Sequence, residues 1–119
     1  MNKLTIFVLF LFVVSFVNPH ALGKFLIEEP LKRGETAEAY VTIRNNFHTN
    51  LEDVNTKLYI YDLGLTYTSI SDDIQKRDHI VQSLFMPMPK NIKPGVYLAK
   101  LRVGNDKFTD TQHVYLRIV

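Results

Sequence analysis

A strict two-residue alternation in the middle of the chain constrains the fold more than any other feature. Between Thr36 and Arg44 every second side chain is apolar, and the residues between them are polar or aromatic. The apolar positions are Ala37, Ala39, Val41 and Ile43. Successive side chains of a strand point to opposite faces, so this pattern predicts a strand with one buried face and one solvated face.

The same period recurs in short runs that are separated by turn residues. We predict strands over residues 25–29, 36–44, 54–61, 65–70, 79–86, 96–103 and 112–119, and a polar connection over residues 71–78. No run of helical periodicity occurs after Gly23. Short strands at this spacing predict an all-β, immunoglobulin-like sandwich of two sheets, similar to a fibronectin III domain. Its core should contain Val41, Ile43, Leu58, Ile60, Leu101, Val103, Leu116 and Ile118.

The composition is that of a single globular domain. The chain has 119 residues, of which 46% are hydrophobic and 22% charged, and its formal net charge is +2. These fractions exclude an intrinsically disordered chain, and the charge is too balanced to indicate nucleic-acid binding. The sequence contains no cysteine, which excludes disulfide scaffolds, thiol nucleophiles and cysteine-type zinc sites.

The first 23 residues have the layout of a secretory signal peptide. Lys3 precedes an uncharged apolar run over residues 4–17, Asn18 and Pro19 end that run, and small residues follow at 21–23. As a helix the run reaches about 21 Å, short of the roughly 30 Å hydrocarbon core, so we expect cleavage rather than a membrane anchor.

We therefore predict a signal helix over residues 1–23, followed by a sandwich domain over residues 24–119. The protein is expected to be secreted or displayed at the cell surface. An exported chain without disulfides favours a prokaryotic envelope over a eukaryotic secretory route.

Several segments resemble a known group of modules. Residues 34–45 (GETAEAYVTIRN), 51–54 (LEDV) and 94–97 (PGVY) resemble the extracellular immunoglobulin-like modules of the cell-adhesion-related group, the APHP or CARDB domains. Residues 58–64 (LYIYDLG) are similar to archaeal surface-protein versions of these modules. The resemblance implies a CARDB-like sandwich of archaeal or bacterial envelope proteins that binds or supports without catalysis. Such sandwiches often tie a tyrosine hydroxyl to the preceding corner, and Tyr97 stands at that position.

No constellation of residues indicates an enzyme. The acidic connection with Asp72, Asp73 and Asp78 matches no calcium-loop spacing, and Lys76 and Arg77 interrupt it. The histidines after residue 23 have no zinc-binding spacing, and no serine lies in a Gly-x-Ser-x-Gly elbow. We therefore expect no catalytic residue, no metal and no cofactor.

The outward positions of three predicted strands collect cations and aromatic rings. The third, sixth and seventh strands of such a sandwich share a sheet, so the alternation puts eight candidate binding residues on one solvent face. These are Lys57, Tyr59, Tyr61, Lys100, Arg102, His113, Tyr115 and Arg117. Exposed rings among cations stack on sugars or bases and pair with anionic groups. The alternative interpretation is an ordinary solvated sheet surface with favourable cross-strand pairs.

These observations predict an exported, non-enzymatic envelope module that binds a protein or an anionic surface polymer in an adhesion or structural role. Nucleic acid is not expected as a partner, and a membrane is expected only if residues 1–23 are retained. An alternative is a chaperone or assembly subunit that acts through an exposed strand edge, because open sheet edges present unpaired backbone groups.

Overall fold

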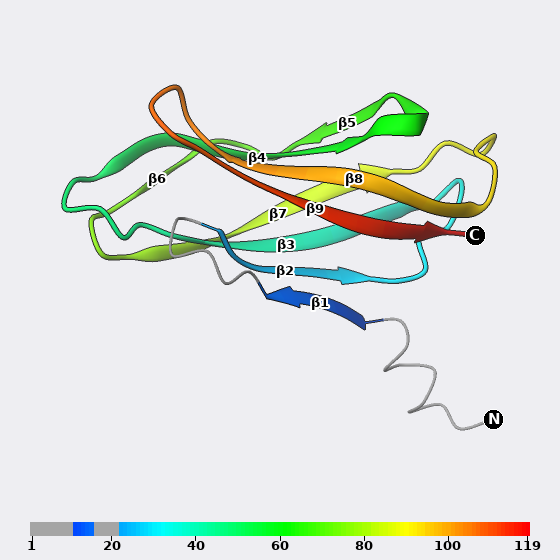
Figure 1. Cartoon of the computed structure of the whole chain (residues 1–119), viewed down its shortest axis with the longest axis horizontal. Coiled ribbons are helices and arrows are strands. Elements are labelled where there is room, and N and C mark those ends of the chain that lie inside the picture. Colours follow the sequence, from blue (N-terminus) through cyan, green and yellow to red (C-terminus); the bar gives the residue numbers. More distant parts are fainter. Residues whose placement is uncertain (1–10, 16–21) are drawn as a thin grey trace.

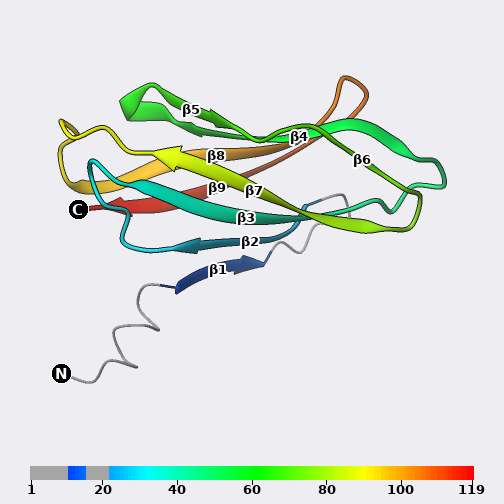
Figure 2. The same ribbon diagram turned by 180° about the vertical axis from the view of Figure 1, so that it is seen from behind.

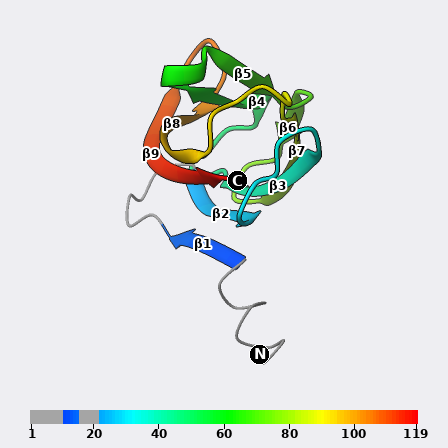
Figure 3. The same ribbon diagram turned by 90° about the vertical axis from the view of Figure 1, so that its right-hand side faces the viewer.

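The computed structural model describes residues 11–15 and 22–119, which form an all-β sandwich (Figure 1). Its elements are β1 (Leu11–Ser15), β2 (Leu22–Glu28), β3 (Thr36–Arg44), β4 (Leu51–Ile60), the 3-10 turn η1 (Tyr61–Leu63), β5 (Leu65–Thr68), β6 (Asp72–Ile74), β7 (His79–Pro87), β8 (Gly95–Gly104) and β9 (Thr109–Ile118). Seen end-on, the two sheets form two layers around one core (Figure 3). The predicted immunoglobulin-like sandwich is confirmed.

The two sheets bring together strands that are distant in sequence. One sheet has the order β1-β2-β3-β7, and the other has the order β5-β4-β8-β9 with β6 also paired to β4. All the strand pairs within them are antiparallel. Figure 2 shows β3 and β7 side by side, and the register pairs Thr36 with Pro87 at one end and Arg44 with His79 at the other.

The inward positions of both sheets form one apolar core. All eight side chains that the sequence assigns to the core are at most 1% exposed. The alternation of β3 therefore predicts its buried face correctly, and the same holds for β4, β8 and β9. Strands β2 and β7 add further fully buried side chains, namely Phe25, Ile27, Leu84 and Met86. Burial of one face of each strand is the main stabilising contribution in such a sandwich.

The chain after β2 crosses from one sheet to the other. Leu31 forms a parallel bridge with Ile118 of β9. Its backbone N–H donates to the Arg117 carbonyl, and its carbonyl accepts from the Val119 N–H, both at 2.8 Å. Pro30, which cannot donate to a ladder, lies where β2 leaves β3. The crossing covers part of the outer edge of β9 and joins the two sheets at that side.

The start of β2 bears on the predicted boundary between leader and domain. Leu22 is 3% exposed, pairs with Ile43 of β3, and donates its backbone N–H to the Asp110 carboxylate at 3.1 Å. β2 therefore begins two residues before the predicted first residue of the domain, Lys24. A chain that started at Lys24 would lack the buried Leu22 side chain and its hydrogen bond.

The predicted leader is described over residues 11–15 and at Leu22 and Gly23, which begin β2. Over Leu11–Ser15 the chain is the strand β1, paired with β2 in an antiparallel register, and not the predicted signal helix. Phe12, Val13 and Val14 are residue types that favour strands, and β2 offers them a sheet edge. The rest of the predicted signal peptide lies outside the described residues. Among the described residues, no helix is long and apolar enough to cross a membrane.

Several details of the sequence prediction are wrong. Strands β4 and β9 begin at Leu51 and Thr109, each three residues earlier than predicted, and β5 ends at Thr68 instead of residue 70. The predicted polar connection over residues 71–78 contains β6, whose Ile74 is 1% exposed and pairs with Leu51. Pairing is possible because β4 carries a bulge between Leu51 and Val54. The predicted third strand ends one residue early, because Tyr61 begins η1, which Gly64 closes in the left-handed conformation at φ 63°.

The corner tyrosine predicted from the sequence is confirmed. The Tyr97 hydroxyl donates to the Lys93 carbonyl, four residues upstream and before β8 begins. The ring is half-buried and packs against the core. Tyr97 therefore fixes the turn that leads into β8, and its role is structural.

A buried glutamine connects β7 to the opposite sheet. Gln82 is 2% exposed and faces inward among the apolar side chains of β7. Its amide nitrogen donates to the Val54 carbonyl at 2.9 Å and to the Asp72 carboxylate at 3.1 Å. Its oxygen accepts from the Thr56 hydroxyl at 2.7 Å. Because every polar atom of this amide has partners, the network holds the two sheets in a defined relation.

Candidate functional site

The sheet register brings the predicted binding residues onto one face. Strands β4, β8 and β9 are adjacent, as predicted, and their outward side chains form rows across the sheet. The first row is Lys57–Arg102–Thr111, the second Tyr59–Lys100–His113, the third Leu98–Tyr115 and the fourth Val96–Arg117. Tyr61 joins the face from η1 rather than from β4. We call the eight predicted residues the cationic face: Lys57, Tyr59, Tyr61, Lys100, Arg102, His113, Tyr115 and Arg117.

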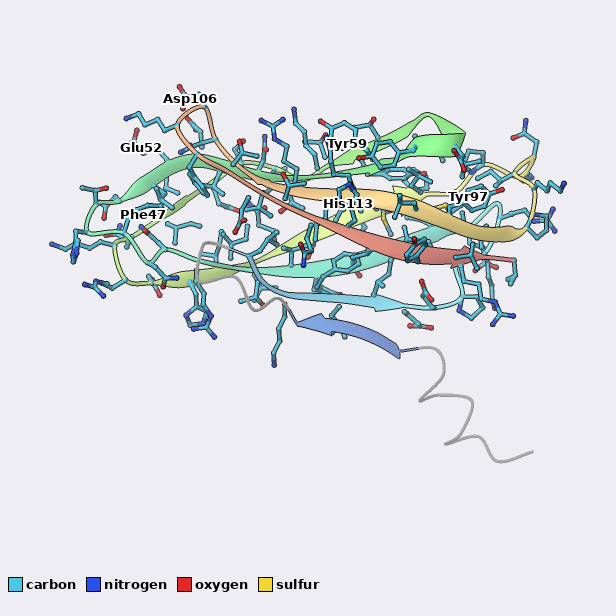
Figure 4. All side chains as sticks on the ribbon, in the orientation of Figure 1. Phe47, Glu52, Tyr59, Tyr97, Asp106 and His113 are labelled. Atoms are coloured by element: carbon cyan, nitrogen blue, oxygen red, sulfur yellow. The ribbon has the colours of Figure 1, made fainter. Side chains whose placement is uncertain are left out.

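Two pairs of side chains at the centre of the cationic face are in contact. The Lys100 ammonium lies 5.1 Å above the centre of the Tyr59 ring, which is a cation–π geometry. The Tyr61 and His113 rings are stacked at 6.1 Å with an interplanar angle of 20°, and the Tyr61 hydroxyl lies 3.2 Å from His113 Nε2. Tyr59 and His113, both labelled in Figure 4, lie in one row across the sheet with Lys100 between them. These contacts reduce the freedom of the rings before any ligand arrives.

The cations of this face are not balanced by acids on it. Lys57 and Arg102 are directly opposite each other on neighbouring strands, and Lys100 follows on the next row. From Asn55 onward, no outward-facing position of β4, β8 or β9 is acidic. Within the described part of the chain, the ion pair at 3.9 Å between Asp78 and His79 is the one salt bridge found, and it lies elsewhere. Like charges directly opposite each other destabilise a sheet, so this arrangement lowers the stability of the domain when no counter-charge lies nearby.

Arg117 differs from the other cations of the face. Its backbone N–H donates to the Glu29 carboxylate at 3.1 Å, and its charge acts on that carboxylate. Partial burial raises the pKa of Glu29, while the hydrogen bond and the charge of Arg117 act in the opposite direction. Arg117 therefore has an acidic neighbour at the far end of the face. The unbalanced charge is concentrated on Lys57, Lys100 and Arg102.

The aromatic and aliphatic side chains of the face are exposed to different degrees. Tyr61 is 49% exposed and Tyr115 is 64% exposed, whereas Tyr59 is half-buried beneath Lys100. Val96, which is 65% exposed, extends the face beside Arg117. Two shallow cavities, of about 370 Å³ and about 440 Å³, are lined by none of the eight residues. The cationic face is thus a sheet surface and not a pocket.

Sequence reasoning missed two other exposed features. The outer face of the opposite sheet carries Val81 and Phe85, which are 59% and 60% exposed. At the loop end of the sandwich, the rings of Phe47 and Phe108 lie 5.8 Å apart (Figure 4 labels Phe47). The alternation of β7 could have revealed the first feature. The second has no signal in the sequence, because the two loops meet through the fold alone.

The acidic and histidine residues weighed as metal ligands do not gather into one cluster. Among residues 11–15 and 22–119, no three His, Cys, Asp or Glu side chains gather in a way that could hold a metal ion. The Asp72 carboxylate accepts from Gln82, and the Asp73 carboxylate accepts from the Asp53 backbone N–H at 3.1 Å. His48 lies 3.2 Å from an Arg77 guanidinium nitrogen. Each of these groups has a local hydrogen-bond partner.

Comparison with known proteins gives a fold and no sequence family. No family model matches the chain, and no curated protein matches it by sequence. The CARDB domain of a Pyrococcus furiosus protein, solved in complex with di-metal ions, is similar with a TM-score of 0.61 and 12% identity, covering 89% of this chain and 93% of that domain. The C-terminal domain of Wzt gives a TM-score of 0.59 and 12% identity, covering 92% and 78%.

A similarity to an enzyme covers a minor part of that enzyme. A family 123 glycoside hydrolase from Clostridium perfringens has a TM-score of 0.54 and 12% identity, over 75% of this chain but 22% of the enzyme. The match therefore concerns one module of a larger chain. Together these similarities confirm the CARDB-like, immunoglobulin-like fold that the resemblance implied. Such a fold fits a module that binds or supports, and fold alone assigns no ligand.

Proposed function

We propose that this chain is an exported, non-enzymatic module of the cell envelope that binds an anionic macromolecule through its cationic face. The observation that carries the proposal is the group formed by Lys57, Arg102 and Lys100, which are adjacent on β4 and β8. No outward-facing position is acidic on β4 from Asn55 onward, on β8 or on β9. The predicted leader and the CARDB-like fold support the envelope location.

Repulsion among these three cations favours the binding of an anionic ligand. Two unit charges about 6 Å apart in water repel each other by about 0.7 kcal/mol, and the three cations form more than one such pair. An anionic group placed between them reverses the sign of this energy. The same charges raise the rate of encounter with an anionic partner, since exposed charges steer association.

The chemistry on the face suits binding rather than catalysis. It contains cations, phenols and one imidazole, and His113 is engaged with Tyr61 rather than with a nucleophile. Ser69, the serine in contact with the buried network, bonds to Gln82 at 3.0 Å and not to a histidine. We therefore assign no reaction to this site.

The test is a binding assay with a fractionated cell envelope of the source organism. The double substitution Lys57→Glu and Arg102→Glu should weaken binding by at least about tenfold, mainly through slower association. It should also reduce the dependence of binding on salt, because exposed charges are screened beyond about 8 Å at physiological ionic strength.

A matched control carries the same change in net charge away from the face. Lys32→Glu and Arg44→Glu alter two exposed cations, one in the turn before β3 and one at the end of β3. This control should leave binding close to that of the wild-type chain. Equal loss in both double variants would show that net charge matters and that the cationic face does not, and would refute the proposal.

One observation favours the second candidate function, assembly through a strand edge. Leu11–Ser15 pairs with Lys24–Glu28 along the open side of β2. Removal of the leader would leave that backbone edge free to accept another strand. Envelope binding that is indifferent to both double variants would favour this edge over the cationic face.

A further inference from the structure

We infer that the ligand of the cationic face is an acidic polysaccharide that lies across β4, β8 and β9, with a negatively charged sugar between Lys57, Arg102 and Lys100 and neighbouring sugar rings against Tyr61 and His113. This inference rests on the proposed function and names the class of ligand for the same site.

The three cations are close enough together to share one anionic group. Neighbouring strands are about 4.8 Å apart, and successive outward residues of one strand are about 6.7 Å apart. Lys57 and Arg102 are opposite each other, and Lys100 is one row further along β8. One carboxylate or sulfate group can therefore contact more than one of these three side chains. The remainder of the face holds Arg117 alone as a full cation, so the rest of the ligand must be recognised by other means.

The rings beside these cations form a surface that suits a sugar ring. Tyr61 and His113 are stacked and joined through the Tyr61 hydroxyl, so they present a fixed, partly apolar surface with a polar rim. A sugar ring has the matching construction, with an apolar C–H face and a rim of hydroxyl groups. Tyr115, on the row next to His113, continues this surface along β9. A ligand that combines a negative charge with neighbouring sugar rings engages both parts of the face.

The composition and flat shape of the face favour a polysaccharide over a protein as the ligand. Protein interfaces have a core depleted of lysine, with large apolar side chains that fill pockets on the partner. Here Lys100 occupies the centre of the face above Tyr59, and the cavities of about 370 Å³ and about 440 Å³ lie off the face. An extended polymer does not need a pocket, because it makes many shallow contacts along its length.

The small number of cations favours a polysaccharide over a lipid surface as the ligand. A basic residue near an anionic membrane strengthens binding about fivefold, so the four cations of the face, Arg117 included, correspond to a dissociation constant of only about 1 mM. Stable membrane attachment through this face would need further anchors. Stacked sugar rings add binding energy where the charges alone are insufficient.

The experiment measures binding of the exported chain, as it is secreted, to four defined probes. These are polygalacturonic acid, neutral dextran, poly-L-glutamate and vesicles of phosphatidylglycerol, and isothermal titration or affinity electrophoresis gives the dissociation constants. We expect polygalacturonic acid to bind more tightly than each of the other three. Lys57→Gln with Arg102→Gln should weaken that binding by at least about tenfold.

A variant of the rings distinguishes stacking from charge. Tyr61→Ala removes the partner of His113 without changing the charge of the face, and its urea midpoint should remain close to that of the wild-type chain because Tyr61 is half exposed. It should weaken binding to polygalacturonic acid by about fivefold or more, since the C–H face of the sugar loses its contact with the apolar face of the phenol ring. Residual binding to poly-L-glutamate should not change.

Two results would overturn the inference and leave the proposed function intact. In the first, poly-L-glutamate or the vesicles bind as tightly as polygalacturonic acid, and Tyr61→Ala changes the binding of no probe. The second is envelope binding that depends on Lys57 and Arg102 while polygalacturonic acid does not bind. Failure of the proposed function gives a different pattern, in which the charge variants leave envelope binding unchanged.

Discussion

Replacement of Gln82 by methionine tests how the two sheets are held together. Methionine has nearly the same volume as glutamine, so the change leaves little cavity and removes the hydrogen bonds of the amide. The Thr56 hydroxyl and the Val54 carbonyl then lose their hydrogen bonds to Gln82, and both residues are 0% exposed. Asp72 is half-buried and can be hydrated in place of its bond to Gln82.

The expected loss follows from these two buried groups. A buried polar group left without a partner costs about 1–3 kcal/mol, so two of them predict a loss of about 4 kcal/mol in the free energy of unfolding. That is a large fraction of the stability of a domain of this size. Urea unfolding followed by circular dichroism measures it, and the slope of the transition should stay the same because the surface exposed on unfolding does not change.

A double variant isolates the contribution of the Thr56 hydroxyl. Thr56→Val by itself leaves the Gln82 oxygen bonded to the Ser69 hydroxyl at 3.0 Å. In the Gln82→Met background, the same change removes a group that has already lost its partner. Thr56→Val should therefore recover about 1–2 kcal/mol of stability there. Strict additivity of the two substitutions, or a loss below about 1 kcal/mol for Gln82→Met, would refute the role of the network.

Four further predictions concern the core, the corner, the pH dependence of stability and the start of the exported chain. Leu116→Ala should cost about 2–5 kcal/mol because it leaves a cavity, and Tyr59→Ala much less, which urea midpoints would show. Tyr97→Phe removes the bond that fixes the corner and should cost about 1 kcal/mol by the same assay. Burial raises the pKa of Glu29 above its usual 4.5, so its ionisation opposes folding; Glu29→Gln should gain stability relative to the wild-type chain as the pH rises above 4.5, which unfolding curves at several pH values test. We predict that the chain is exported and that its leader is removed, so that it begins near Lys24; intact mass would distinguish that start from one that keeps Leu22 or the whole leader.

The sequence alone determines the fold class and the faces of the strands. The period of two in β3, β4, β8 and β9 requires that one set of side chains be buried, because a shift of one residue would move every apolar side chain into solvent. For this reason the alternation by itself assigns Leu58 and Leu116 to the core, and Tyr59 and Tyr115 to the surface. The corner at Tyr97 is equally predictable, since it depends on residues close in sequence.

The tertiary structure decides what depends on residues distant in the chain. Alternation turns Gln82 inward, but its partners Thr56 and Asp72 come from β4 and β6 of the opposite sheet, and no local pattern predicts them. Strand β6 forms by pairing with the first residues of β4 on either side of a bulge, although two of its three residues are acidic. The candidate site falls between these cases. The outward positions of its residues follow from local sequence, whereas the opposition of Lys57 to Arg102 and the stacking of Tyr61 on His113 depend on the pairing of β4, β8 and β9, because register is fixed by long-range contacts.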